Sequence, residues 1–204
     1  MRESVPRGRL IALDGTDGPH LQWAARRVLA TLRSEAVEGG VSSWDASGIF
    51  YELRHGAPNL APPTPRTLVL LYASDLVFRL RWEIRPALEE GKCVIAAPYV
   101  ESAIAFGKAA RLPKRWMLDL FRFAPRPNTC YSVSDSTPAA SANGADPMNG
   151  FFEFCCQQLS ACSPPWSGTE LKARSAQYFD RLRRIGRCSP LPTHAVEPGS
   201  RFQR

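Results

Sequence analysis

The sequence predicts an α/β protein built as a three-layer, doubly wound, mostly parallel sheet. Short apolar runs typical of buried strands alternate with longer segments in which apolar residues recur at helical spacing. Of the 204 residues, 44% are hydrophobic and 22% are charged, a globular mix that excludes wholesale disorder, a collagen-like fibre and a coiled coil. No apolar run approaches the roughly 18 residues of a membrane span, so we expect no membrane contact.

The first elements follow from residues near the N-terminus. A strand is expected at 9–13, where Arg-Leu-Ile-Ala-Leu leads into a tight turn at 14–18. Pro19 suits the first turn of a helix, whose apolar positions recur until Gly39 and Gly40 end it. A second strand is expected at 41–44.

The middle of the chain predicts one long helix and two further strands. Residues 55–65 indicate an irregular loop, and Thr64 before Pro65 is an N-cap signal. The helix that follows is expected to kink or break before Pro86 and to end at Gly91. A fully buried strand is expected at 92–96. Helices near 101–110 and 113–123 then lead to a fourth strand at 129–133.

The C-terminal third predicts a loop, a helix and a tail. Residues 134–149 are small, polar and Pro/Gly-bearing, which indicates a flexible loop. Ser167 and Glu170 stand at capping-box spacing before a helix that ends at Gly186. One face of this helix is expected to carry Leu171, Tyr178, Leu182 and Ile185. We therefore predict a single domain at 1–186 and an unstructured, basic, Pro-containing tail at 187–204.

Charge is concentrated at the C-terminus. The net charge is +7, and residues 172–204 contribute +6 of it, with eight basic side chains against Asp180 and Glu197. The body is thus almost neutral, which argues against a nucleic-acid ligand. The N-terminus lacks the apolar segment of a signal peptide, so we expect a cytoplasmic location.

The six cysteines show no metal-binding pattern. None forms a Cys-x-x-Cys pair, and the cluster of Cys155, Cys156 and Cys162 has no nearby His. Cys93 and Cys130 lie in apolar runs, where Cys behaves as a small hydrophobe. We therefore expect reduced thiols and no metal site.

Three blocks of sequence carry a resemblance. Residues 7–18 read Arg-Gly-Arg-Leu-Ile-Ala-Leu-Asp-Gly-Thr-Asp-Gly. Residues 70–75 read Leu-Leu-Tyr-Ala-Ser-Asp, followed at 84–92 by Ile-Arg-Pro-Ala-Leu-Glu-Glu-Gly-Lys, and residues 94–106 read Val-Ile-Ala-Ala-Pro-Tyr-Val-Glu-Ser-Ala-Ile-Ala-Phe. In order and spacing these blocks resemble the thymidylate kinase family over residues 7–133. The resemblance implies a P-loop, nucleoside-monophosphate-kinase-like fold whose Gly-rich loop binds phosphate through backbone N–H groups.

Several positions that neutralise phosphate in that family differ here. His20, Leu21 and Gln22 stand where the phosphate loop has its last Gly, its Lys and its Ser or Thr. Leu76 replaces an Arg that contacts the acceptor phosphate, and Ala97-Pro98 replaces an Asp-Arg pair. The family also has arginines in a lid, whereas residues 127–171 contain no Lys or Arg. We therefore assign no catalytic residue and expect no need for ATP or Mg²⁺.

The resemblance leaves seven candidate nucleotide-binding residues: Gly15, Asp17, Gly18, Tyr72, Ser102, Phe106 and Arg111. In the family, the residue matching Asp17 approaches the sugar hydroxyl and the residue matching Tyr72 stacks on the thymine ring. Each position also has a plain structural interpretation. The glycines and Asp17 would shape a turn, Tyr72 and Phe106 would fill the core, and Arg111 would be a surface charge.

Two hypotheses remain open. One is a thymidylate-kinase-like protein without catalysis, a pseudokinase that binds a nucleoside or a protein; the resemblance implies a homodimer packed through the long helices, and a heteromeric partner is the other option. The alternative is a divergent, active dTMP kinase that uses ATP and Mg²⁺ and recruits Arg26, Arg79, Arg111 or the C-terminal arm. A phosphate-sized cavity at 15–22 lined by free N–H groups would favour the alternative.

Overall fold

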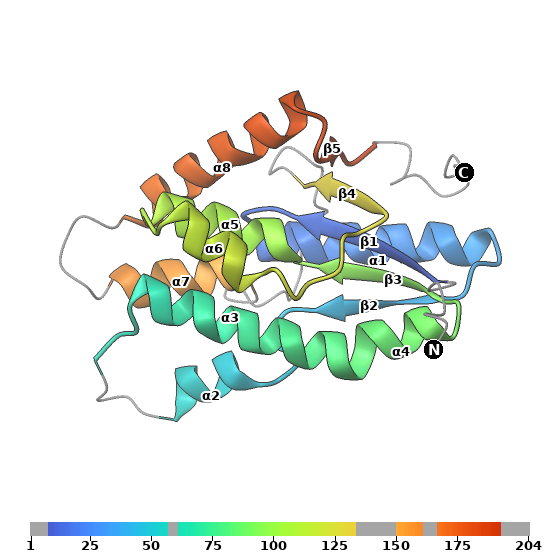
Figure 1. Cartoon of the computed structure of the whole chain (residues 1–204), viewed down its shortest axis with the longest axis horizontal. Coiled ribbons are helices and arrows are strands. Elements are labelled where there is room, and N and C mark those ends of the chain that lie inside the picture. The colour runs from blue at the N-terminus through green and yellow to red at the C-terminus, as the bar shows by residue number, and fades with distance from the viewer. Residues whose placement is uncertain (1–7, 57–60, 134–149, 161–166, 193–204) are drawn as a thin grey trace.

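The protein folds around a five-stranded parallel sheet with strand order β2-β3-β1-β4-β5 (Figure 1). The computed structural model describes residues 8–56, 61–133, 150–160 and 167–192. The strands are β1 (Arg9–Asp14), β2 (Gly39–Ser43), β3 (Cys93–Ala97), β4 (Thr129–Ser132) and β5 (Ser189–Pro190). The predicted α/β architecture is confirmed, with one strand more than the four that the sequence indicated.

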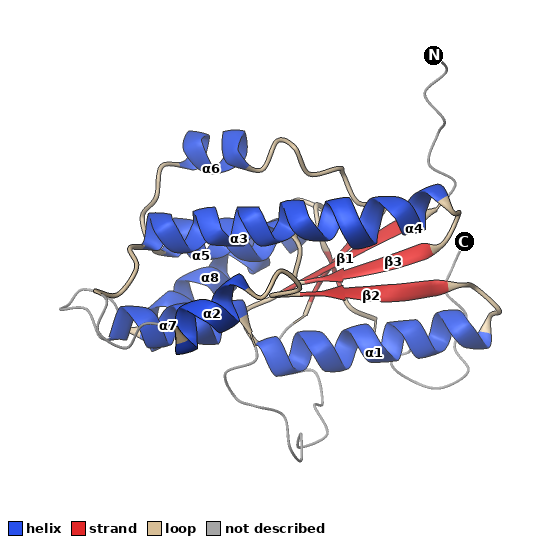
Figure 2. Cartoon of the chain, turned by 90° about the horizontal axis from the view of Figure 1, so that it is seen from below, coloured by secondary structure: helices blue, strands red, loops and turns tan. Residues whose placement is uncertain are grey.

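Apolar residues run consecutively along the central strands and their side chains point alternately to the two faces, so each face of the sheet has its own core. Helix α1 (Gly18–Ser34) covers one face, packing on Ile11, Leu13 and Ile95. The opposite face, with Leu10, Ala12 and Val94, packs against α3 (Pro65–Arg79), η1 (Leu80–Ile84), α4 (Arg85–Glu89) and α5 (Val100–Ala109). Figure 2 shows these helices and α1 on opposite sides of the sheet, which gives the three layers.

Four further helices complete the described fold: α2 (Ile49–His55), α6 (Lys114–Leu120), α7 (Phe151–Ser160) and α8 (Gly168–Arg184). Helices α6 and α8 correspond to predicted helices, and the sequence analysis expected neither α2 nor α7. The loop predicted at 134–149 lies outside the described residues. Among the described residues, no helix has the length and apolar character needed to cross a membrane.

The first helix ends earlier than predicted. Helix α1 stops at Ser34, because Ala36 adopts a left-handed backbone (φ 58°) and the Val37 N–H turns back to the Leu32 carbonyl. Gly39 is the first residue of β2 rather than a helix terminator. A Cβ at Gly39 would lie 2.5 Å from the Cys93 carbonyl oxygen, so close pairing with β3 requires a glycine there.

The long helix continues past the predicted break before Pro86. Thr64 caps its start as expected, accepting from the Thr67 N–H at 3.2 Å. Residues Leu80–Ile84 form a π-helical stretch, and Pro86 lies in the first turn of α4. The wider π turn accommodates a residue that has no N–H to donate.

The C-terminal prediction needs two corrections. Ser167 caps α8 as expected, but Ile185 is 58% exposed, and Ser175 and Phe179 join Leu171 and Leu182 on the buried face. The chain after 186 was expected to be an unstructured tail. Instead, Cys188 is buried and β5 pairs in parallel with β4. Residues 193–204 lie outside the described part of the chain.

The expectation that all thiols are reduced is wrong for one pair. Cys130 of β4 and Cys188 form a disulfide across 58 residues, which attaches β5 to the sheet. Cys93, Cys155 and Cys156 are free. Cys162 of the predicted cluster lies outside the described residues, and within them no group of three His, Cys, Asp or Glu side chains could hold a metal ion.

Candidate functional site

The candidate site lies where β1 ends and α1 begins. Asp17 is the N-cap of α1, and its Oδ1 accepts from the His20 N–H at 2.9 Å and lies 2.7 Å from the His20 ring Nδ1. Burial raises the pKa of Asp17, but the His20 hydrogen bonds and the charge of Lys172 outweigh it and hold that pKa below its usual value. The turn interpretation of Asp17 is thereby confirmed.

Four N–H groups between residues 15 and 21 already have acceptors. The Gly15 N–H donates to Ser102 Oγ at 3.0 Å, and the same hydroxyl donates to the Gly15 carbonyl at 3.0 Å. The Gly18 N–H donates to Glu153 Oε2 at 3.3 Å. In the first turn of α1, the His20 N–H has Asp17 Oδ1 and the Leu21 N–H has the Asp17 carbonyl, at 3.0 Å. These four groups are therefore not free to bind a phosphate.

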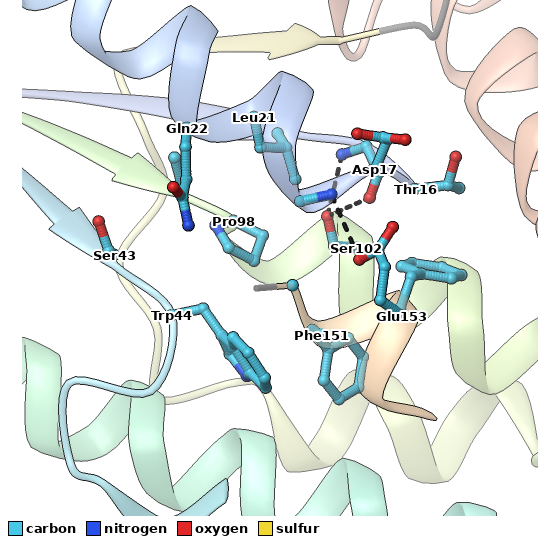
Figure 3. Close-up of a pocket in the computed structure, with 15 residues that line it drawn as sticks. Thr16, Asp17, Leu21, Gln22, Ser43, Trp44, Pro98, Ser102, Phe151 and Glu153 are labelled. Atoms are coloured by element: carbon cyan, nitrogen blue, oxygen red, sulfur yellow. Dashed lines mark hydrogen bonds between the residues drawn. The ribbon is translucent and has the colours of Figure 1, made fainter. Parts of the chain in front are cut away.

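The loop also has little space above it. A pocket of about 10 Å³ lies there, room for about one water molecule. The loop, the ends of β2 and β3, Ser102 and the start of α7 form its walls. Figure 3 shows Glu153 of α7 reaching toward the loop, while the Phe151 ring points away from it. Among the described lining residues are two carboxylates, Asp17 and Glu153, and no Lys or Arg.

The structure brings together four of the seven predicted binding residues. Gly15, Asp17, Gly18 and Ser102 line the small pocket. Tyr72 and Phe106 are fully buried in the core, and Phe151 packs against both, with ring centroids at 4.5 Å and 5.3 Å. Arg111 is exposed in the turn between α5 and α6 and does not line the pocket. Nucleotide binding by these residues remains a prediction.

Tyr72 has a structural partner of its own. Its hydroxyl donates to the Tyr99 carbonyl, and burial raises the pKa of Tyr72 well above its usual value. The phenol therefore stays protonated and joins α3 to the segment that precedes α5. This bond holds the Tyr72 ring in the core, where it packs against Phe151.

Sequence reasoning missed the residues that α7 and α8 bring to the loop. These are Gly150, Phe151 and Glu153 at the start of α7, with Lys172 of α8. Phe151, Phe154, Cys155 and Leu159 are buried at helical spacing, so the apolar periodicity of 151–159 could have predicted an amphipathic helix. Nothing in the sequence indicated that this helix would cover the loop.

A larger cavity lies elsewhere in the described structure. It measures about 600 Å³ and opens between α5 and the segment that joins α6 to β4. Its wall includes the side chains of Arg122, Arg126 and Arg187. The described structure thus holds a cavity far larger than the pocket at the loop.

Asp14, the last residue of β1, should make stability depend on pH. Its Oδ1 accepts from the N–H groups of Tyr99 and Ser102, while no hydrogen bond reaches Oδ2 within the described structure. Burial, followed by the nearby charge of Glu101, raises the pKa of Asp14 from 3.8 to about 6. The protonated carboxyl therefore favours the folded state below about pH 4, and this contribution is lost as the pH rises through 6.

Asp14→Asn removes this titration and keeps an oxygen for the two N–H donors. We expect the wild type to lose about 3 kcal/mol relative to the variant between about pH 4 and pH 8, since one pKa unit corresponds to about 1.4 kcal/mol. Urea unfolding of both proteins across that range measures the difference. Parallel pH profiles for the two proteins would contradict the assignment.

Comparisons with known proteins identify relatives of this chain and a solved structure with the same fold. No protein-family model matches the chain. The thymidylate kinase of Xanthomonas oryzae pv. oryzae (strain PXO99A) is 30% identical over 178 residues, which cover 84% of this chain and 76% of the relative. A probable thymidylate kinase of Thermococcus gammatolerans is 44% identical over 130 residues, covering 59% and 62% of the two chains.

A solved structure shares the fold. The crystal structure of thymidylate kinase from Ehrlichia chaffeensis aligns with a TM-score of 0.62 at 14% identity, covering 93% of this chain and 94% of that one. The parallel sheet and the loop between β1 and α1 define an α/β protein of the P-loop kinase type. With the identity to the Xanthomonas enzyme, the chain belongs to the thymidylate kinase family.

Proposed function

We propose that this chain is a member of the thymidylate kinase family that transfers no phosphate and works through protein interaction. The observation that supports this most strongly is the pocket of about 10 Å³ at the loop, where a phosphoryl group would have to lie. Phosphoryl transfer depends on positioning and on neutralising the charge that develops on the phosphate. The loop offers neither the space nor a free cation among its described lining residues.

The replaced positions support the same conclusion. Leu21 is 4% exposed and packs in the core beneath α1, so no ammonium can project from its position. Leu76 is fully buried, and Ala97-Pro98 lines the pocket without a charge. These residues do not fit ATP with Mg²⁺, because they supply neither the Lys and hydroxyl of a phosphate loop nor a carboxylate for the metal.

The arginines that an active enzyme would have to recruit are engaged or distant. Arg79 is fully buried and donates to the Ser42 hydroxyl at 2.9 Å and to the Ser42 carbonyl at 2.8 Å. Arg26 and Arg111 are exposed and do not line the pocket. Arg26, Arg79 and Arg111 therefore give the divergent-kinase alternative no support.

A coupled ADP-release assay with ATP, Mg²⁺ and dTMP tests the proposal, with an active thymidylate kinase as the positive control. We expect the rate with this chain to equal the rate without protein. A rate that rises in proportion to the concentration of this chain, and needs dTMP, would overturn the proposal.

An exposed apolar face on the long helix supports a protein partner. Leu70, Val77, Phe78 and Trp82 project from α3 and η1 and are 38–65% exposed, and the Arg81 guanidinium lies 5.6 Å from the Trp82 ring centroid. Exposed apolar residues gathered on one face are typical of interaction surfaces. We propose a second copy of this chain as the partner, since the family resemblance implies a dimer through these helices.

Trp82→Glu should therefore convert a dimer into a monomer. We expect light scattering to give about twice 22.6 kDa for the wild type and 22.6 kDa for the variant, because a charge replaces the most exposed ring of the face. Tyr51→Glu is the matched control, since Tyr51 is 60% exposed but lies on α2 and not on the long helix. A monomeric wild type, or an equal effect of both variants, would contradict the dimer.

A further inference from the structure

The residue before α7, Gly150, lies against the loop too closely for a side chain to fit between them. A Cβ placed on Gly150 would lie 2.6 Å from the Gly18 Cα, so only a glycine fits at this contact. The Phe154 N–H donates to the Gly150 carbonyl at 3.0 Å, which holds Gly150 to the helix. The two segments can therefore lie this close because a glycine, Gly150, faces another glycine, Gly18.

A carboxylate occupies the anion position of the loop. Glu153 Oε2 accepts from the Gly18 N–H at 3.3 Å, at the N-terminus of α1, where the helix dipole favours negative charge (Figure 3). The Glu153 side chain is only 11% exposed. Burial raises the pKa of Glu153 even though Lys172 acts to lower it.

Lys172 holds this carboxylate from α8. Its Nζ lies 3.1 Å from Glu153 Oε1 and 4.0 Å from Asp17 Oδ2. Burial alone would lower the pKa of Lys172, but the two carboxylates raise it above its usual value, so the ammonium stays charged. The loop thus has a cation nearby after all, contributed by α8 instead of by position 21.

An aromatic ring accompanies the carboxylate. Phe151, two residues before Glu153, is 2% exposed and packs between Tyr72 and Phe106, the aromatics that the family resemblance assigns to the nucleoside side. One helical turn therefore presents a ring to the aromatic side of the site and a negative charge to the loop, as a nucleoside phosphate would.

We infer that residues 150–153 are an internal ligand of the degenerate phosphate loop, with Glu153 replacing the phosphate and Lys172 as its positioning residue. This internal ligand does not require the absence of phosphoryl transfer, because the same Glu153 contact could also hold an active kinase in a closed state. We expect removal of the carboxylate to expose an anion site made by the Gly18 N–H and the Lys172 ammonium.

Rescue by inorganic phosphate tests this inference. Glu153→Ala should lower Tm by about 4–8 °C, the size expected for a lost charge-assisted hydrogen bond in a chain of this length. Inorganic phosphate, compared with chloride at equal ionic strength, should then raise the Tm of Glu153→Ala by about 3 °C more than that of the wild type. Glu170→Ala is the matched control, because Glu170 is an exposed carboxylate in the first turn of α8.

The cation is tested in the same experiment. Adding Lys172→Met to Glu153→Ala should abolish the extra phosphate effect. An equal phosphate effect on Glu153→Ala and the wild type, or a rescue that survives Lys172→Met, would overturn the inference. If Glu153→Ala does not fold, Glu153→Gln takes its place; it should lower Tm without phosphate rescue, and a wild-type Tm in Glu153→Gln would likewise overturn it.

Failure of the internal-ligand inference can be distinguished from failure of the proposed function. Turnover by the wild-type chain would contradict the loss of catalysis and leave the internal ligand to be judged by phosphate rescue. Absence of phosphate rescue would contradict the internal ligand and would not bear on the loss of catalysis.

Discussion

Asp75→Ala is expected to lower the free energy of unfolding by about 3–5 kcal/mol, the range for removing one partner of a buried ion pair. Asp75 and Arg79 are both fully buried on α3, with Oδ2 and Nη1 4.0 Å apart. Asp75 also accepts from the Ser47 N–H at 2.9 Å and the Ser47 hydroxyl at 2.8 Å. The variant would therefore lose the attachment of the segment after β2 and leave a buried guanidinium without its carboxylate.

Urea unfolding at constant pH measures this loss. Asp119→Ala is the matched control, because Asp119 and Arg115 form a pair of the same i,i+4 spacing whose side chains are 62% and 96% exposed. We expect the control to change stability by less than about 1 kcal/mol. Equal effects of the two substitutions would show that the buried pair does not support the fold.

Phe151→Ala is expected to cost about 3–5 kcal/mol, because truncating a large buried ring leaves a cavity that its neighbours fill only in part. The ring contacts Phe50 and Phe152 as well as Tyr72 and Phe106, with centroid separations of 4.5–6.0 Å. These contacts join α7 to α2, α3 and α5. The loss should therefore appear in global unfolding and not only in fraying of α7.

Tyr51→Ala provides the comparison for Phe151→Ala. Tyr51 is 60% exposed on α2, so its truncation opens no cavity in the described core. Denaturant unfolding should give a change several times smaller for Tyr51→Ala than for Phe151→Ala. A Phe151→Ala protein as stable as the wild type would mean that α7 does not pack in the site.

The layers of the fold could be predicted from the sequence because they depend on local patterns. The strand at 9–13, the capped helices after Thr64 and Ser167, and the buried strand near Cys93 each show a period or a cap within a few residues. The pairing of β5 with β4 and the Cys130–Cys188 disulfide could not be predicted, because each joins segments that are far apart in the chain. Cysteine spacing alone does not show which cysteines form a disulfide.

The candidate site was predictable only in part, for the same reason. The loop at 14–18 and the losses at Leu21 and Ala97-Pro98 are visible in sequence, whereas Lys172 counted toward a C-terminal basic segment. In the fold, α8 brings Lys172 beside the loop, where Glu153 and Asp17 neutralise it. Lys172 thus places a cation beside the loop at a position that the sequence did not indicate, although no Lys or Arg lines the pocket within the described residues.

The loop between β1 and α1 is expected to bind no nucleotide, because residues of the same chain fill it. Calorimetric titration of this chain with dTMP, and separately with ATP and Mg²⁺, measures such binding. We expect no saturable heat for either ligand up to about 1 mM, which corresponds to a binding free energy weaker than about −4 kcal/mol. A saturable one-to-one isotherm for either ligand, abolished by a bulky substitution at Gly18, would contradict it.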